Sequence, residues 1–368
     1  LVETGHGNPG LSTDPAEQST TNRNGDTIYN AERSEVVKAV LMAGADRITL
    51  NSTNPDPATP KDITDYRIDP LNQSANGLDV RFGAGQLNIY NSFHILTGGE
   101  QNSRVDLVGG GAVGTYGFDY DPSFGGAGKG GGSNVTGTYT FSTGSSRLLL
   151  TSALVWNVDV AEGGHNSFPG AATLYDMDLR LYDETSGAPV LVAASASTVE
   201  NTENIRTLLD AGRNYLLEVA PKSGQASFEW DYALAWQMTV PVDTDSDGSP
   251  DIIDTDDDND GLPDVIEATV GTHPLLADTD GDGFDDGMEV SYGSDPLLDS
   301  DTPAANYNND GDINDDGTVD AADVLLATRM VLGQLTPTSE QLIRADMVPD
   351  DQVNAGDLVR IQQLALAL

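Results

Sequence analysis

The sequence predicts a multidomain, mainly β chain, with an antiparallel β-sandwich, then a series of acidic loops, then a small α-helical domain. Three observations support this fold class. Apolar residues alternate with a period of two between about residues 134 and 241, which indicates antiparallel strands. Acidic residues recur at fixed spacing in residues 242–301, and two loop–helix units follow in residues 302–368. A length of 368 residues fits several domains of about 150 residues or fewer.

The overall charge excludes several classes of partner. The chain has 59 acidic and 17 basic residues, a net charge of −42 and an isoelectric point near 4.1. We therefore expect no binding to nucleic acid or to anionic membrane surfaces. Because the chain has no cysteine, any stapling falls to metal ions rather than disulfides. No apolar run reaches 18 residues, so we expect no membrane span, and the Leu start without a signal peptide suggests a processed fragment.

Short alternating segments predict the strands of the β-sandwich. They are residues 148–156, 178–182, 189–193, 205–209, 215–220 and 228–240. The last segment separates an apolar set from a more polar set. One set is Phe228, Trp230, Tyr232, Leu234, Trp236, Met238 and Val240, and the other is Glu229, Asp231, Ala233, Ala235 and Gln237. This pattern predicts one buried face and one wetter face. The aromatic stripe is interpreted as core rather than as a sugar-binding platform.

Two elements are expected before the sandwich. Residues 31–45 predict a helix that Asn30 caps, with Val36, Val37, Val40 and Leu41 on one face. Residues 83–96 predict a glycine turn and then a short element with three buried side chains. These three are Leu87, Ile89 and Tyr90. The apolar faces must be covered by the following domain, by a part outside this chain or by a neighbouring copy.

The glycine-rich segment of residues 109–132 leaves two interpretations open. Its composition is typical of a flexible linker. Alternatively, the alternation of Tyr116, Phe118 and Tyr120 predicts one short strand that orders the connector.

Three windows of the acidic block repeat one metal-loop pattern: Asp at positions 1, 3 and 5, Gly at 6, Asp at 9 and an acid at 12. Ca²⁺ takes six to eight oxygen ligands, and this spacing wraps them around one ion, with glycine permitting the turn. Without cations so many carboxylates would repel one another. Loop I has Asp243, Asp245, Asp247, Asp251 and Asp254; loop II has Asp256, Asp258, Asp260, Asp264 and Glu267; loop III has Asp278, Asp280, Asp282, Asp286 and Glu289. We expect several bound Ca²⁺ ions.

The C-terminal residues predict two further loops. Loop IV places Asp312, Asn314, Asp316, Asp320 and Asp323 at positions 1, 3, 5, 9 and 12, with a carbonyl of Thr318 at position 7. A helix is expected at residues 321–332. Loop V keeps Asp346, Asp350, Asn354 and Asp357 at positions 1, 5, 9 and 12. Val348 and Asp351 replace a ligand and the glycine, so we expect weaker metal binding there.

Other candidate chemistry is weak. His6 stands alone in a Gly/Pro loop, which is typical of a surface residue. Asp176, Asp178 and Asp183 could hold Ca²⁺, but acids at strand ends more often belong to turns.

Several segments resemble known families. Loops I–III, with their GTHPL and GSDPL connectors, resemble bacterial thrombospondin type 3 repeats, and loops IV and V with their helices resemble a type I dockerin. Residues 134–241, with ALVWNVD, YDMDLRLYD and DYALAWQ, resemble the sandwich that follows many subtilase catalytic domains. The order LVETG, SEVVKAVLMAGA and RFGAGQLNIYNSFHIL resembles the end of a subtilisin-like serine peptidase domain, a small α/β segment. The expected domains are residues 1–106, 107–133 (connector), 134–241, 242–301 and 302–368.

These resemblances imply a secreted or cell-surface, non-catalytic C-terminal region of a subtilisin-like peptidase precursor. The family's serine, histidine and aspartate motifs do not occur in the chain, so no catalytic residue is predicted. The acidic block is expected to be a Ca²⁺-stiffened spacer rather than a sensor, because it shows no helix pair. The dockerin-like end is expected to bind a protein partner, although Ala321, Ala322, Ala355 and Gly356 at loop positions 10 and 11 offer little side-chain chemistry to a cohesin.

Two alternatives remain open. One is a processed structural subunit that self-associates into a homo-oligomer, filament or matrix. The other is part of an active serine peptidase whose catalytic triad lies upstream.

Overall fold

The computed structural model describes residues 1–15, 17–47, 73–80, 82–104, 110–125, 136–160, 172–303, 310–347 and 352–366. These residues form two compact units that meet in sequence at residues 242 and 243. The first unit contains the ranges that the sequence divides into residues 1–106, 107–133 and 134–241. The second contains the acidic loops and the C-terminal helices. Each unit is described by itself.

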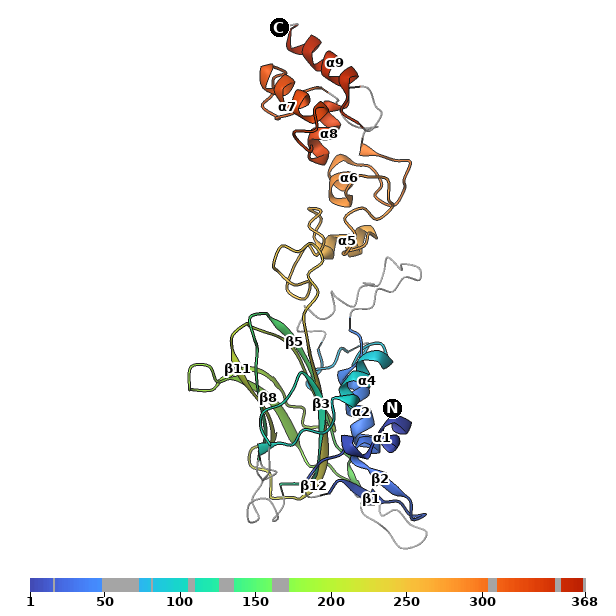
Figure 1. Ribbon diagram of the computed structural model, residues 1–368, viewed down its shortest axis with the longest axis vertical. Coiled ribbons are helices and arrows are strands. Elements are labelled where there is room, and N and C mark those ends of the chain that lie inside the picture. The colour runs from blue at the N-terminus through green and yellow to red at the C-terminus, as the bar shows by residue number, and fades with distance from the viewer. Residues whose placement is uncertain are drawn as a thin grey trace. The chain divides into compact units, whose positions relative to one another are not determined.

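The first unit is built on two four-stranded antiparallel sheets (Figure 1), which confirms the predicted fold class. One sheet has the strand order β10-β5-β12-β3 and the other β4-β11-β8-β9. Six strands lie within a few residues of the predicted segments, whereas β4 was not anticipated. The bounds are β3 Tyr116–Phe124, β4 Gly137–Ser142, β5 Leu148–Val155, β8 Met177–Asp183, β9 Val190–Ser195, β10 Thr202–Leu209, β11 Asn214–Pro221 and β12 Trp230–Thr239.

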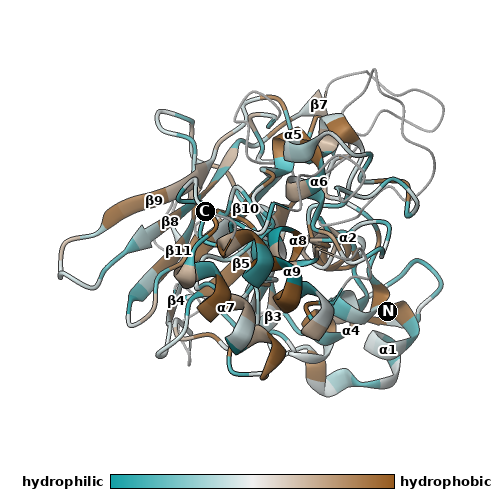
Figure 2. Cartoon of the chain, turned by 90° about the horizontal axis from the view of Figure 1, so that it is seen from above, coloured by the Kyte–Doolittle hydropathy of each residue, from teal (hydrophilic) through white to brown (hydrophobic). Residues whose placement is uncertain are grey.

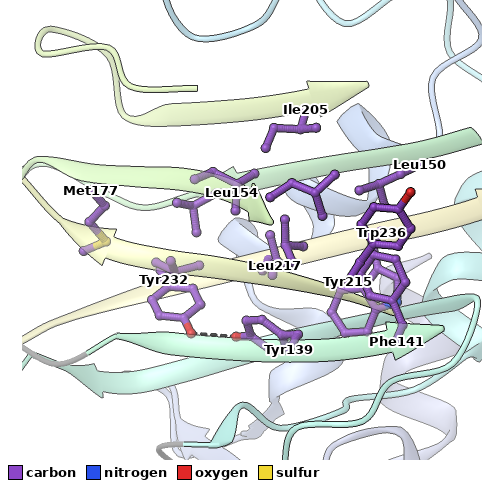
Figure 3. Close-up of a cluster of buried hydrophobic side chains, with 14 of the residues drawn as sticks. Tyr139, Phe141, Leu150, Leu154, Met177, Ile205, Tyr215, Leu217, Tyr232 and Trp236 are labelled. Atoms are coloured by element: carbon purple, nitrogen blue, oxygen red, sulfur yellow. Dashed lines mark hydrogen bonds between the residues drawn. The ribbon is translucent and has the colours of Figure 1, made fainter. Parts of the chain in front are cut away.

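The predicted aromatic stripe of β12 lies in the core between the two sheets. Trp236 is fully buried, its ring centroid lies 5.7 Å from that of Tyr139, and its indole N–H donates to the carbonyl of Gly114 at 2.9 Å. The hydroxyls of Tyr139 and Tyr232 lie 2.6 Å apart across the core (Figure 3). The stripe is therefore core, as interpreted, except that Val240 at its end is exposed.

The opposite face of β12 is also buried, so the prediction of a wetter face is wrong. Helices α2 (Ser34–Ala43) and α4 (Ile89–Thr97) cover this side of the sheet. Ala233 and Ala235 are fully buried against the helices, and the Gln237 amide donates to the carbonyl of Ala43 at 2.9 Å. The small side chains of Ala233 and Ala235 suggest a surface position in the sequence, but in the structure they let a helix approach the strand closely. The following domain is thus what covers the apolar face of α2.

The start of α2 differs from the prediction. The helix begins at Ser34, after a 3₁₀ turn, and Asn30 does not cap it. The amide of Asn30 is buried instead and donates to the carboxylate of Glu100 at 2.9 Å and to the carbonyl of Glu17 at 2.6 Å. A long-range hydrogen bond has replaced the local cap that the sequence suggested.

The apolar residues before and at the start of α4 are exposed rather than buried. Leu87, Ile89 and Tyr90 have exposed fractions of 59%, 56% and 71%. Asn88 caps the helix through the N–H of Asn91, and the helix buries Ser92, Ile95 and Leu96 instead. The prediction that the three residues are core is therefore wrong.

The glycine-rich connector contains an ordered strand. The tyrosine and phenylalanine alternation belongs to β3, which pairs with β12 along residues 116–124. This outcome matches the alternative in which aromatic residues order the connector. Residues 126–135 lie outside the described residues.

Short elements complete the unit. Strand β9 lies at a sheet edge and exposes Val190, Leu191 and Val192, the brown strand of Figure 2. The others are α1 Val2–Gly7, η1 Pro9–Leu11, β1 Ser19–Thr21 paired with β2 Thr27–Tyr29, η2 Asn30–Glu32, and β6 Asp159–Val160 paired with β7 Ala172–Thr173.

The second unit has little apolar core. Its helices are α5 Asp264–Val270, α6 Asp286–Tyr292, α7 Ala321–Val331, α8 Ser339–Ala345 and α9 Ala355–Ala365. A small cluster that includes Ile313, Met330 and Ile361 packs the C-terminal helices. The acidic block contains α5 and α6, which corrects the expectation that it has no helices. None of the helices in the described part of the chain is long and apolar enough to cross a bilayer.

Candidate metal centres

The carboxylates at positions 1, 3 and 5 of loops I, II and III gather as the spacing predicts. In each loop, one oxygen from each of the three aspartates lies within 4.8 Å of the others. The groups are Asp243, Asp245 and Asp247; Asp256, Asp258 and Asp260; and Asp278, Asp280 and Asp282. Three carboxylates at this separation repel one another strongly unless a cation or protons neutralise them.

The glycine at position 6 allows each loop to turn. Gly248, Gly261 and Gly283 have φ angles of 103°, 90° and 101°, a region that other residues rarely adopt. The turned backbone directs each glycine N–H to the aspartate at position 1, at 3.2, 3.2 and 2.9 Å respectively. The first ligand is therefore fixed by the chain itself.

Backbone N–H groups also fix the aspartates at positions 3 and 5, and in loop III they do so through one oxygen of each. In loop III, Asp280 accepts from the N–H of Asp282 at 3.1 Å, and Asp282 accepts from the N–H of Phe284 at 2.9 Å. Their other oxygens are buried and accept no hydrogen bond from the described residues. The full set of such oxygens at positions 1, 3 and 5 of loops I–III is Asp243 Oδ1, Asp256 Oδ1, Asp258 Oδ2, Asp280 Oδ2 and Asp282 Oδ2. Buried carboxylate oxygens without donors fit a site for a cation.

The ligands at positions 9 and 12 come from helices in loops II and III. Asp264 and Asp286 begin α5 and α6, so Glu267 and Glu289 follow three residues later on the same helix face. Both glutamates are fully buried. One oxygen of Glu289 accepts from the hydroxyl of Ser294 at 3.0 Å, whereas Oε2 accepts no hydrogen bond within the described part of the chain.

Loop I has the same design without a following helix. Asp251 accepts from the N–H of Thr244 at 2.8 Å and from its hydroxyl at 3.0 Å. Asp254 accepts from the N–H of Thr255 at 2.7 Å and leaves Oδ2 without a donor among the described residues. Loop III repeats the first contact, since Asp286 accepts from the N–H and hydroxyl of Thr279.

Burial and crowding raise the pKa values of these carboxyls. Desolvation, with a smaller contribution from Asp258 and Asp260, raises the pKa of Glu267 to about 9. Desolvation and the neighbouring Asp260 raise the pKa of Asp258 to about 7, and desolvation chiefly raises that of Glu289 to about 7. Loops II and III thus concentrate more negative charge than they can stabilise without a cation.

Loop IV of the C-terminal region is satisfied differently. Asp312 accepts from the N–H groups of Asp316 at 3.2 Å and Gly317 at 2.8 Å, while the Asn314 amide donates to Asp316 at 2.9 Å. The hydroxyl of Thr318 donates to Asp316 at 2.7 Å. Two side-chain donors inside loop IV therefore act on its position-5 aspartate, whereas loops I and III direct a threonine hydroxyl to the position-9 aspartate.

The last two ligands of loop IV also cap α7. Asp320 accepts from the N–H of Ala322 at 2.7 Å, and Asp323, fully buried, accepts from the N–H groups of Asp320 and Asn314. This is a reciprocal capping box.

Loop V repeats the box at α9. Asp357, fully buried, accepts from the N–H of Asn354 at 2.8 Å, and Asn354 accepts from the N–H of Gly356 at 2.7 Å. Asp346 at position 1 is buried. Asp350, like Val348 and Asp351, lies outside the described residues.

Arg344 is a feature that the spacing did not reveal. Its guanidinium lies 2.8 Å from Asp315 and donates to the carbonyl of Asp312 at 3.3 Å. A fixed positive charge from α8 therefore lies against loop IV.

Two segments of the second unit match known protein families. Residues 310–364 match the dockerin type I domain. Residues 256–277 and 278–298 match the bacterial TSP3 repeat, so loops II and III are the matched repeats and loop I precedes them. The oxygen-only donor sets of these TSP3 repeats and of the dockerin domain suit Ca²⁺, a hard cation.

No curated protein matches the chain. Solved structures match about a third of it at low similarity. A pre-peptidase C-terminal domain of a collagenase from Bacillus anthracis is 16% identical, with 34% of this chain and 93% of that chain covered and a TM-score of 0.24. The VP2 subviral particle of infectious bursal disease virus is 16% identical, with 33% of this chain and 30% of that chain covered and a TM-score of 0.20. A xylanase from Cellvibrio japonicus is 10% identical, with 30% of this chain and 22% of that chain covered and a TM-score of 0.17.

The remaining candidates have structural partners. His6 is exposed and lies 2.9 Å from the carboxylate of Glu32. Asp176, Asp178 and Asp183 each pair with a cation, at 3.0 Å from Lys222, 2.5 Å from Arg180 and 3.5 Å from Arg213. These ion pairs favour the interpretation of the three aspartates as acids at strand ends.

Proposed function

We propose that this chain is a secreted calcium-dependent spacer and anchoring module. The TSP3 repeats and loop I bind Ca²⁺ and stiffen, and the dockerin domain attaches the chain to a cohesin on an extracellular scaffold of the cellulosome type. The observation that carries the proposal is the set of buried carboxylate oxygens without donors, in loops that precede a dockerin match.

Each residue class has a defined task in this proposal. When bound, Ca²⁺ supplies the positive charge that cancels the mutual repulsion of the carboxylates. The glycines turn the loops, the backbone N–H groups orient the aspartates, and the buried glutamates close loops II and III. Since unfolded chain has no such arrangement, cation binding contributes directly to folding.

The proposed contact of the dockerin domain with a cohesin is largely apolar. Ala321, Ala322, Ala355 and Gly356 are exposed but small. Leu325 and Leu332 on or just after α7 and Val359 on α9 are exposed apolar side chains. These residues offer an apolar surface in place of hydrogen-bonding side chains at loop positions 10 and 11.

The test is binding of the full chain to a panel of type I cohesins by calorimetry. We expect binding in millimolar Ca²⁺ and its loss in EDTA or in the variant Asp323→Asn. Glu340→Gln removes an exposed acid of the same domain outside the metal loops and is expected to bind normally. Absence of binding to every cohesin in millimolar Ca²⁺ would contradict the anchoring role.

We infer further that residues 1–242 belong to a subtilisin-like peptidase precursor as a non-catalytic region. The order of its segments supports this, and so does the exposed apolar face of Leu87, Ile89 and Tyr90, which suits contact with a further peptidase part. An active peptidase with its triad upstream is the stronger form of this inference. Labelling the native preparation with a fluorophosphonate probe, followed by intact-mass analysis, distinguishes the two forms. If the preparation contains no labelled or associated serine peptidase, the inference of an active peptidase has no support.

The second candidate function is a structural subunit of an extracellular fibre. The observation that favours it is the apolar edge strand β9, because an exposed sheet edge can pair with a strand of another copy. Sizing and electron microscopy of the chain in millimolar Ca²⁺ test this. A strict monomer at all concentrations would exclude it.

A further inference from the structure

A backbone N–H group of loop III donates a hydrogen bond to loop II. The N–H of Gly287, on α6, donates to Oδ2 of Asp260 at 2.8 Å. The other oxygen of Asp260 accepts from the N–H of Leu262 within its own loop at 2.6 Å. Asp260 is the position-5 aspartate of loop II, so the next repeat along the chain orients a candidate ligand of the repeat before it.

The approach of the two repeats requires glycine at residue 287. A Cβ atom there would lie 2.5 Å from the carbonyl oxygen of Asp260 and 2.9 Å from the nitrogen of Leu262. Both distances are too short for a side chain, and both atoms belong to backbone that cannot turn aside. Glycine favours a helix less than alanine does, so α6 has a less favourable residue at the point of contact.

The contact distinguishes loop III from the other TSP3-type loops. Gly287 occupies position 10 of loop III, between the ligands Asp286 and Glu289 on the same helix. Position 10 is Ile252 in loop I and Val265 in loop II, and the side chain of Val265 is 61% exposed. The glycine at this position is therefore matched to close packing and is not a general feature of the repeat.

We propose that Gly287 is a positioning residue that couples Ca²⁺ binding in loops II and III. This inference rests on the proposed calcium function. Binding at loop III fixes Asp286 and Glu289, and with them the segment of α6 that carries Gly287. The fixed N–H then holds Asp260 in the orientation that loop II needs, so occupancy of either loop favours occupancy of the other.

The experiment is a Ca²⁺ titration of the full chain followed by hydrogen exchange with mass spectrometry. Peptides spanning residues 256–267 and 278–289 report the two loops separately. We expect Glu289→Gln, a change in loop III alone, to raise the Ca²⁺ midpoint of loop II about 5-fold or more as well as that of loop III. Gly287→Ala keeps every ligand and is expected to raise the midpoint of loop II about 5-fold.

The glycine variant separates contact from helix propensity. Alanine favours the helix, so a purely local effect would strengthen loop III and leave loop II unchanged. Ser291→Ala, on the exposed side of α6, is the matched control and is expected to leave both midpoints unchanged. An unchanged midpoint of loop II in both Glu289→Gln and Gly287→Ala would overturn the coupling while calcium binding stands. If Ca²⁺ protects neither loop in the unaltered chain, the proposed function itself fails.

Discussion

The two units of this chain are stabilised in different ways. In the first, two sheets and two helices bury large apolar side chains such as Trp156, Phe118 and Trp236 in continuous clusters. In the second, loops I–III bury carboxylates, and apolar packing is confined to a small cluster among the C-terminal helices. One polypeptide therefore combines a fold held by the hydrophobic effect with a fold whose buried carboxylates repel one another when no cation is bound.

Removal of divalent cations is the strongest way to break this comparison. In EDTA we expect residues 243–303 to expand and lose protection, and the dockerin domain to loosen, because buried carboxylates repel one another. The sandwich unit is expected to keep its near-ultraviolet spectrum and its protease resistance. Small-angle scattering and limited proteolysis measure both effects. Identical scattering with and without EDTA would contradict the metal dependence of the second unit.

A core substitution tests the opposite half of the comparison. Trp236→Ala removes a fully buried side chain and is expected to destabilise the sandwich unit by about 3–5 kcal/mol. The Ca²⁺ midpoints of loops I–III are expected to stay unchanged, since the loops belong to a separate compact unit and independent sites act additively. Val240→Ala, at an exposed position just after β12, should change the free energy of unfolding by about 0.5 kcal/mol or less. Denaturant unfolding followed by tryptophan fluorescence provides the measurement.

The pH dependence of the metal-free loops should run opposite to that of an ion-paired carboxylate. The pKa of Glu267 is about 9 in the folded loop against an ordinary 4.5, so the folded state holds a proton that the unfolded chain has released. Stability of the metal-free loop therefore falls as pH rises from about 4.5 toward 9. Cation binding at pH 7.5 must displace this proton, because only the carboxylate binds metal.

Calorimetry in two buffers with different ionisation enthalpies measures that proton release. We expect unequal apparent heats for the unaltered chain and a smaller difference for Glu267→Gln. Equal heats in both buffers for the unaltered chain would show that the carboxyls are already ionised.

The smallest expected effect concerns the dockerin domain. Arg344→Gln removes the guanidinium that contacts Asp315 and the carbonyl of Asp312, and we expect a loss of about 1 kcal/mol in metal-free stability. Arg329→Gln, at an exposed position of α7, is the matched loss of charge and should have almost no effect. Thermal unfolding monitored at residues 310–347 by hydrogen exchange distinguishes them.

The candidate metal centres were predictable from the sequence because they are local. Every candidate ligand of a loop lies within 12 residues, and in loops I–IV the turn depends on one glycine at position 6. The strands of the sandwich were predictable for a similar reason, since alternation is a short-range signal.

What the sequence did not show depends on distant segments. The packing of α2 on β12 joins residues about 190 positions apart. Because no local pattern shows this contact, the sequence predicts that Ala233 and Ala235 lie on the surface. Leu87, Ile89 and Tyr90 are apolar, so the sequence predicts that they are core. Their exposure depends instead on which side of this segment packs against the sheet. Arg344 and Gly287 carry no pattern of their own, and only their contacts reveal their roles.

The alanine residues of the sheet that pack against α2 limit how the β-sandwich can be produced as a separate fragment. A fragment that starts near residue 134 would expose Ala153, Ala233, Ala235 and the unsatisfied amide of Gln237 on one face of the sheet. Such a surface promotes aggregation. The smallest piece suited to recombinant work therefore begins before Ser34, although β-sandwich pattern alone would place the cut a hundred residues later.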